Sequence, residues 1–131
     1  MTDLTHILGK PFRLGARGPQ AYDCVGVAIE VVRAHKGGAA AAALPCGETS
    51  RASGEIPSGW VRVAGEPYGA APGDVVLTAR TGEDGEVEQH LYVGVGFSKF
   101  ATSDRKRGAI VVPLRAIQDE VVGVYRWGGA A

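Results

Sequence analysis

The stretch AYDCVGVAIEVVR, residues 21–33, is the segment around which we expect the fold to form. Gly18 and Pro19 interrupt the chain before it, and Asp23 suits an N-cap because its carboxylate can accept a hydrogen bond from a free N–H group of the first turn. The pattern predicts a helix that ends near residue 36, before Gly37-Gly38. Helical spacing predicts its buried stripe, made of Val25, Ala28, Ile29 and Val32.

Cys24 lies in the first turn of this predicted helix. The positive end of the helix dipole favours a thiolate over a thiol, so a base placed opposite would make Cys24 a nucleophile. The alternative is that Cys24 is a small buried core residue, since free cysteines are among the most buried residue types. The helix pattern alone leaves both interpretations open.

Composition limits the class of protein. A chain of 131 residues with 45% hydrophobic residues suits one domain, residues 1–131. Lys plus Arg and Asp plus Glu both number 14, which argues against a nucleic-acid-binding protein. Without a membrane-length apolar run or a signal-peptide pattern, we expect no membrane insertion and synthesis in the cytoplasm. We expect both cysteines, Cys24 and Cys46, to be free thiols.

The rest of the chain predicts an α+β fold, because the helix is followed by β-rich segments separated by turns rather than by alternating helices. The alanine run at 39–43 suits either a helix extension or a loop, and residues 44–59 suggest a long surface excursion. We expect an antiparallel sheet of about five strands, drawn from segments near 60–63, 75–79, 87–95, 99–103, 109–114 and 121–127.

A cysteine nucleophile needs a base, and the chain has three histidines. His6 is expected in a mobile N-terminus, and His35 in the last turn of the helix, where it suits the negative end of the dipole. Only His90, on a predicted strand, is free to face the start of the helix. Thr102 is the leading candidate to orient His90 from the next strand, since Ser103 would point to the opposite face.

Four blocks of sequence resemble the NlpC-type papain-like cysteine peptidases, in particular the short versions found among phage-tail proteins. The resemblance covers nearly the whole chain, and the four blocks follow one another in the family's order. Val112-Pro113-Leu114 and Gly123-Val124-Tyr125-Arg126 also fit the phage subgroup. The four blocks are PFRLG at 11–15, YDCVG at 22–26, PGDVVL at 72–77 and the strand HLYVGV that begins at His90.

The resemblance implies a papain-like fold and roles for individual residues. Cys24 would be the nucleophile, His90 the general base and Thr102 the orienting group, where the family more often has histidine, asparagine or glutamine. The substrate would be a bacterial cell-wall peptide, cleaved through a thioester without metal or cofactor. The residues implied in substrate binding are Phe12, Tyr22 and Asp23.

Three hypotheses follow for the function. The first is a peptidoglycan peptidase or amidase of a phage or phage-like tail, with tail hub or baseplate proteins as partners and the virion as its location. The second is a catalytically weak or inactive member of the fold that acts as a structural tail-tip protein. The third is a metal site of Cys24, Cys46 and His90, which lacks the closely spaced ligand pairs of typical zinc sites.

Overall fold

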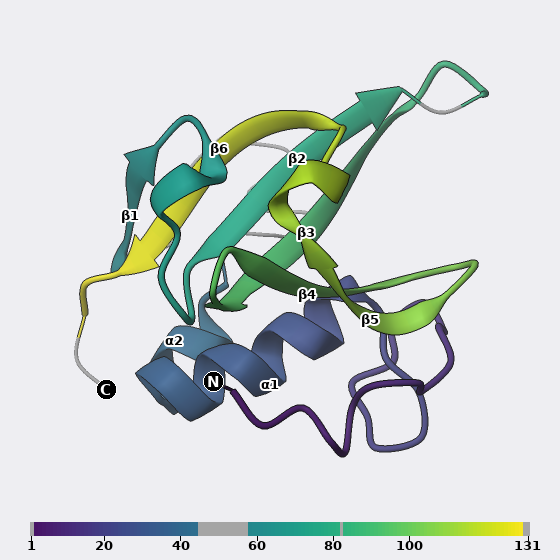
Figure 1. The fold of residues 1–131 in the computed structure, drawn as a ribbon, viewed down its shortest axis with the longest axis horizontal. Helices are drawn as coiled ribbons and strands as arrows, with labels where there is room; N and C mark the ends of the chain where they lie inside the picture. The colour runs from purple at the N-terminus through teal and green to yellow at the C-terminus, as the bar shows by residue number, and fades with distance from the viewer. Residues whose placement is uncertain (1, 45–57, 82, 130–131) are drawn as a thin grey trace.

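The computed structural model describes residues 2–44, 58–81 and 83–129. Within these residues it contains two helices, six strands and two short 3-10 turns (Figure 1). The helices and turns are α1 (Cys24–Lys36), α2 (Gly38–Ala42), η1 (Pro67–Gly69) and η2 (Leu114–Ala116). The strands are β1 (Trp60–Ala64), β2 (Val75–Thr81), β3 (Val87–Gly96), β4 (Lys99–Asp104), β5 (Gly108–Pro113) and β6 (Glu120–Trp127).

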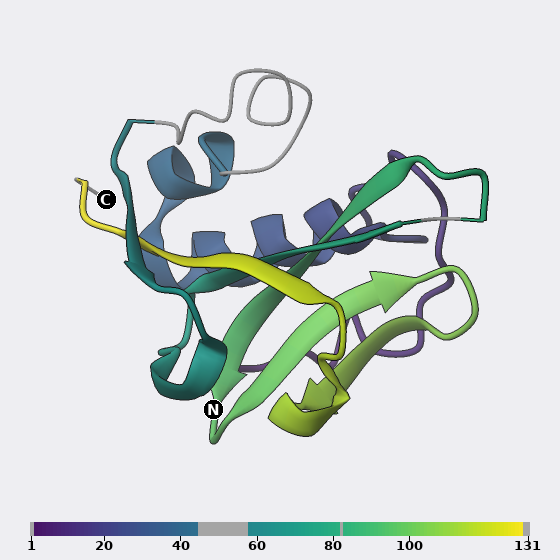
Figure 2. The same cartoon turned by 90° about the horizontal axis from the view of Figure 1, so that it is seen from above.

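The strands form one antiparallel sheet in the order β1-β6-β2-β3-β4-β5. The two helices lie on one face of this sheet, and η1 and η2 lie on the other (Figure 2). The predicted α+β architecture, with the cysteine-bearing helix packed on an antiparallel sheet, is confirmed. The sheet has one strand more than the expected number of about five, because short β1 pairs with β6 at the edge.

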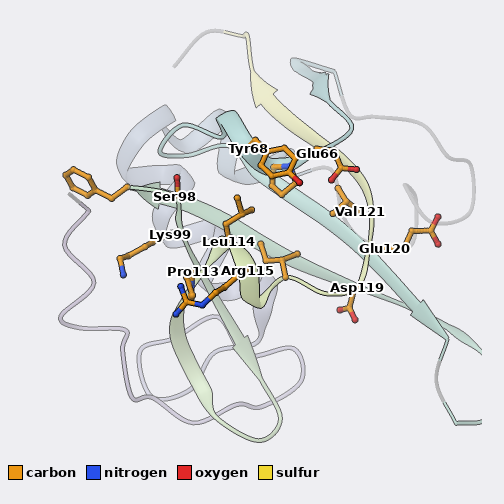
Figure 3. A pocket seen from close by; sticks show the side chains of 13 residues that line it. Glu66, Tyr68, Ser98, Lys99, Pro113, Leu114, Arg115, Asp119, Glu120 and Val121 are labelled. Atoms are coloured by element: carbon orange, nitrogen blue, oxygen red, sulfur yellow. The ribbon is translucent and has the colours of Figure 1, made fainter.

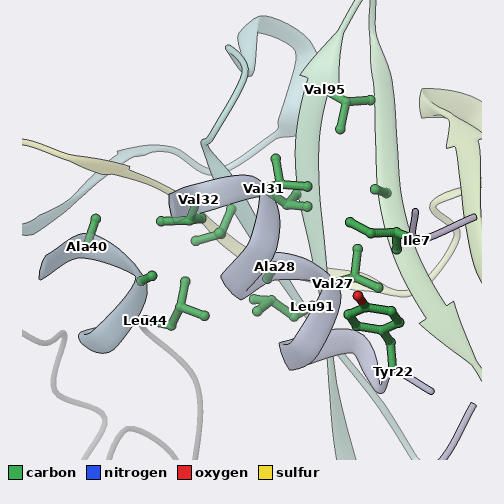
Figure 4. Packing of buried hydrophobic residues seen from close by; sticks show 14 of the residues in the cluster. Ile7, Tyr22, Val27, Ala28, Val31, Val32, Ala40, Leu44, Leu91 and Val95 are labelled. Atoms are coloured by element: carbon green, nitrogen blue, oxygen red, sulfur yellow. The ribbon is translucent and has the colours of Figure 1, made fainter. Parts of the chain in front are cut away.

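Helix α1 begins at Cys24 because the Asp23 side chain accepts a hydrogen bond from the Gly26 N–H, and it ends at Gly37, which has a φ of 94°. The predicted buried stripe was right for Ala28 and Val32 and wrong for Val25 and Ile29, which are only partly buried. The helix is apolar on more than one side, and packing against the sheet selects a different set. The side chains buried in the core are those of Val27, Ala28, Val31 and Val32 (Figure 4).

The N-terminal segment packs on the core, which corrects the expectation that it is mobile. Leu4 and Ile7 are buried, and exposed His6 lies 3.4 Å from a Glu30 carboxylate oxygen. The His35 ring makes a hydrogen bond with the Thr2 hydroxyl. The alanine run forms part of α2. Most of the predicted excursion at 44–59, including Cys46, falls outside the described residues.

Successive side chains of β3 point to opposite faces of the sheet around Leu91, where the candidate site lies. Leu91 and Val93 belong to the core cluster beneath α1, whereas Tyr92 belongs to the cluster on the opposite face. The pairing of β3 with β4 extends only as far as Val93 and Ala101. The backbone of Leu91 is therefore open to side chains from α1 and β4. No helix among the described residues is long and apolar enough to cross a membrane.

Candidate active site

The Asp23 carboxylate fixes the start of α1 to the preceding loop. One oxygen accepts from the Gly26 N–H at 2.7 Å and the other from the Gly15 N–H at 2.9 Å. Arg17 lies 2.7 Å from both oxygens. A Cβ at Gly26 would lie 2.5 Å from the Ala16 carbonyl oxygen, so only glycine lets the helix approach the loop this closely. The loop and the helix start therefore form one rigid unit that carries the thiol.

Cys24 is the first residue of α1, and its side chain is partly buried against the core. Burial raises the pKa of the Cys24 thiol; the Leu91 backbone hydrogen bond acts in the opposite direction, and the nearby Asp23 charge raises it further. The backbone N–H groups at the helix start lower the pKa of the thiol, as expected, but desolvation outweighs them and the net shift is upward. The resting side chain is a neutral thiol.

His90 and Thr102 are joined by a hydrogen bond of 2.7 Å between Nε2 and the Thr102 hydroxyl. The same hydroxyl donates its proton to the Leu91 carbonyl oxygen at 2.8 Å. Because a hydroxyl has only one proton to donate, it must accept the hydrogen from His90. The network therefore assigns the proton of the neutral ring to Nε2 and leaves Nδ1 with a free lone pair.

Burial lowers the pKa of His90, and nearby charges of both signs, Asp119 and Arg80 first among them, act in opposite directions. The ring also packs at 71° against Tyr92, with the ring centroids 4.9 Å apart. The imidazole is therefore neutral at pH 7 and able to accept a proton. The two pKa shifts act in the same sense, since burial disfavours both the Cys24 thiolate and the charged His90 ring.

The backbone of Leu91 connects the three predicted catalytic residues. Its N–H interacts with the Cys24 thiol, its carbonyl accepts from Thr102, and it directly follows His90. Within the described residues, no hydrogen bond joins the Cys24 sulfur to the His90 ring. Such contacts often tighten only when substrate binds. The structure thus brings the three residues to one peptide unit, and their catalytic roles stay predictions.

The residues implied in substrate binding lie around the helix start. Tyr22 is buried, and its carbonyl accepts a hydrogen bond of 2.7 Å from the Ser103 hydroxyl. Asp23 uses its carboxylate for the internal contacts described above. Phe12 is partly exposed, and the Arg105 guanidinium lies 5.3 Å from its ring centroid. Phe12 is therefore the one of these three whose side chain borders solvent, and all three roles stay predictions.

The basic turn at 105–107 contacts residues within and outside the β4–β5 hairpin. Arg105 covers Phe12, and Arg107 makes hydrogen bonds of 2.9 Å and an ion pair of 2.7 Å with Asp104. Figure 1 shows this hairpin tip beside the loop that precedes α1. The Arg105 contact joins the hairpin tip to the loop before α1, whereas the Arg107–Asp104 pair lies within the hairpin.

Among the described residues, no cluster of side chains is suited to bind a metal ion. The described residues contain no group of three or more histidine, cysteine, aspartate or glutamate side chains placed to hold a metal ion, and Cys46 lies outside them.

Sequence reasoning missed Leu91, which acts through its backbone, and Asp119, which is 29 residues from His90. Neither has a local sequence signal, because both depend on how the strands diverge and return.

Comparison with solved structures identifies a similar fold. The chain matches the crystal structure of an NlpC/P60 family protein from Bacillus cereus ATCC 10987 with a TM-score of 0.61 and 20% sequence identity. The match covers 94% of this chain and 37% of the length of that protein. No protein-family model matches the sequence, and no curated protein matches it significantly. The chain therefore has an NlpC/P60-type papain-like fold.

Proposed function

We propose that this protein is a cysteine peptidase that hydrolyses peptide bonds in bacterial peptidoglycan. The observation that carries the proposal is the hydrogen bond between Thr102 and His90, which leaves Nδ1 of His90 basic on the residue next to Leu91, whose backbone N–H interacts with the Cys24 thiol. The NlpC/P60-type fold supports the same class of chemistry. No cofactor is required for it.

The proposed reaction is a general-base attack by sulfur. Nδ1 of His90 takes the Cys24 proton as Sγ bonds to the substrate carbonyl carbon. The N–H groups of Cys24 and Val25, which have no intrahelical partner at the helix start, can stabilise the oxyanion. The imidazolium returns the proton to the leaving nitrogen, the C–N bond breaks, and water then hydrolyses the thioester. Thr102 holds the ring in the productive tautomer throughout.

The proposal includes carriage on a phage or phage-like tail, with tail hub or baseplate proteins as partners and the virion as the location. Its support is the resemblance of the sequence blocks at 112–114 and 123–126 to the phage-tail versions of these peptidases. A structural role at the tail tip is the second candidate. The neutral Thr102 hydroxyl favours it, because a hydroxyl adds no negative charge to stabilise an imidazolium.

The test measures amines released from purified peptidoglycan by the wild-type protein and its variants. We expect release by wild type and by the control Cys46→Ala, and none by Cys24→Ala. Undiminished release by Cys24→Ala would refute the proposed nucleophile. A wild-type protein that releases nothing but binds tail hub proteins tightly would favour the structural role, and particles with Cys24→Ser that assemble without infecting would contradict that role.

A further inference from the structure

An open groove of about 1020 Å³ is lined by residues of η1 and η2, on the face of the sheet that carries these two turns (Figure 3). Pockets for small molecules span roughly 300–1,000 Å³ and enclose most of their ligand. A groove of this size that is open to solvent suits an extended chain better than a compact molecule. Its apolar lining includes Pro67, Tyr68, Leu114, Ile117 and Val121.

Charges of opposite sign line different sides of this groove. Glu66, Asp119 and Glu120 lie on one side in Figure 3, and Lys99 lies on the other, with Arg115 between it and Asp119. None of the five forms an ion pair within the described residues. The two sets of charges are therefore free to interact with a ligand that carries both an amine and a carboxylate.

Two exposed aromatic side chains belong to the same groove. Tyr68 is 75% exposed and Phe97 is 78% exposed. Phe97 and Ser98 both have φ near 56°, the left-handed region that residues other than glycine rarely adopt. Such conformations tend to persist at functional positions. Phe97 and Ser98 form a two-residue hairpin loop, for which positive φ at both positions is the favoured geometry, and this loop presents the Phe97 ring to solvent beside the groove.

The groove is on the same side of the sheet as His90. Alternation along β3 places His90 and Tyr92 on one face, and Leu114, Ile117 and Val121 pack against the cluster that contains Tyr92. Asp119 lines the groove and exerts the strongest electrostatic effect on His90 of any charged group. The groove therefore lies on the sheet face opposite α1, and Asp119 is the lining residue whose charge acts on His90.

We infer that the groove binds an extended peptide segment with an amine-bearing side chain toward Glu66, Asp119 and Glu120 and a carboxylate toward Lys99 and Arg115. The inference goes beyond the proposed function, because neither Cys24 nor His90 lines the groove. Apolar side chains between the two charges lie against Tyr68 and Leu114.

The test measures peptide binding to the full chain with Cys24→Ala, so that no turnover intervenes. The probe is a fluorescently labelled peptide, Lys-Ala-Leu-Ala-Glu with blocked ends, compared by anisotropy with a version acetylated at lysine and a version that ends in glutamine. We expect each modification to weaken binding about fivefold, as expected for losing an exposed ion pair.

Charge-neutralising variants assign each effect to its side of the groove. Combined Glu66→Gln, Asp119→Asn and Glu120→Gln substitutions should abolish the effect of acetylation only. Combined Lys99→Gln and Arg115→Gln substitutions should abolish the effect of the glutamine version only. The matched control, Glu83→Gln with Glu86→Gln in the β2–β3 hairpin, should change neither.

Equal binding of the three peptides would overturn the inference, as would modification effects that persist in both groove variants. These outcomes are independent of the hydrolysis assay. Selective binding by a protein that releases no amines from peptidoglycan refutes the proposed peptidase and supports the groove as a peptide site. Release of amines without selective binding refutes the groove alone.

Discussion

Replacing Thr102 with valine should destabilise the protein and change the chemistry of His90. Thr102 is 1% exposed, and its hydroxyl contacts the Leu91 carbonyl and the His90 ring at 2.8 and 2.7 Å. Valine keeps the shape but leaves both partners without a hydrogen bond, and each buried unpaired group costs about 1–3 kcal/mol. Because His90 is only partly buried, we expect the free energy of unfolding to fall by about 2–4 kcal/mol, or Tm by roughly 10 °C.

Two assays follow this substitution. Thermal unfolding gives the stability, and ¹⁵N NMR of the imidazole gives the tautomer of His90, which should be Nε2–H in the wild type and mixed in Thr102→Val. Loss of this orienting bond should slow hydrolysis by orders of magnitude. Thr102→Ser, which retains the hydroxyl, should restore the wild-type tautomer.

The matched control is Thr78→Val on the neighbouring strand. Thr78 is also buried, but its hydroxyl donates to the His90 carbonyl at 3.2 Å and contacts no ring nitrogen. The Thr78→Val substitution should lower the free energy of unfolding by about 1 kcal/mol and leave the His90 tautomer unchanged. An Nδ1–H tautomer in the wild type, or unchanged stability and tautomer in Thr102→Val, would refute the assigned hydrogen-bond network.

Three further predictions concern the framework and the thiol. Gly26→Ala places a Cβ against a loop carbonyl oxygen and should lower the free energy of unfolding by about 1–3 kcal/mol. Gly38→Ala in α2 places its Cβ in open space and should raise the free energy of unfolding by up to about 1 kcal/mol. Denaturant titration measures both values, and equal effects would contradict the close approach of the helix to the loop at Gly26. Arg126→Gln removes the bidentate partner of the fully buried Asp74 carboxylate and should cost about 3 kcal/mol in the same titration, so an unchanged midpoint would count against this ion pair. Because burial raises the pKa of the Cys24 thiol, its alkylation rate by iodoacetamide should still be rising above about pH 8. A plateau below about pH 7 would show a thiolate instead.

The sequence predicted those features that depend on local spacing. Helix α1 could be placed because Asp23 caps its start and Gly37 ends it. The contact between Thr102 and His90 could be anticipated because alternate residues of adjacent strands share a face. Each inference uses only the geometry of one element or one hairpin. Such geometry is the same wherever the element lies in the protein.

The features that were mispredicted depend on tertiary packing. Val25 and Ile29 fit helical spacing as well as Val27 and Val31 do, and only the position of the sheet decides which pair is buried. The pKa of Cys24 likewise depends on how deeply neighbouring elements bury the thiol, which outweighs its place at a helix start. No pattern of apolar residues encodes that depth.

The central claim, that Cys24 attacks the substrate with His90 as its base, is tested most directly by trapping the thioester. The protein is quenched in acid during reaction with a peptidoglycan fragment, and its peptides are examined by mass spectrometry. We predict an acyl adduct on Cys24 in the wild type and none in His90→Gln. Products that accumulate with no adduct on Cys24, together with a wild-type rate in Cys24→Ala, would contradict the claim.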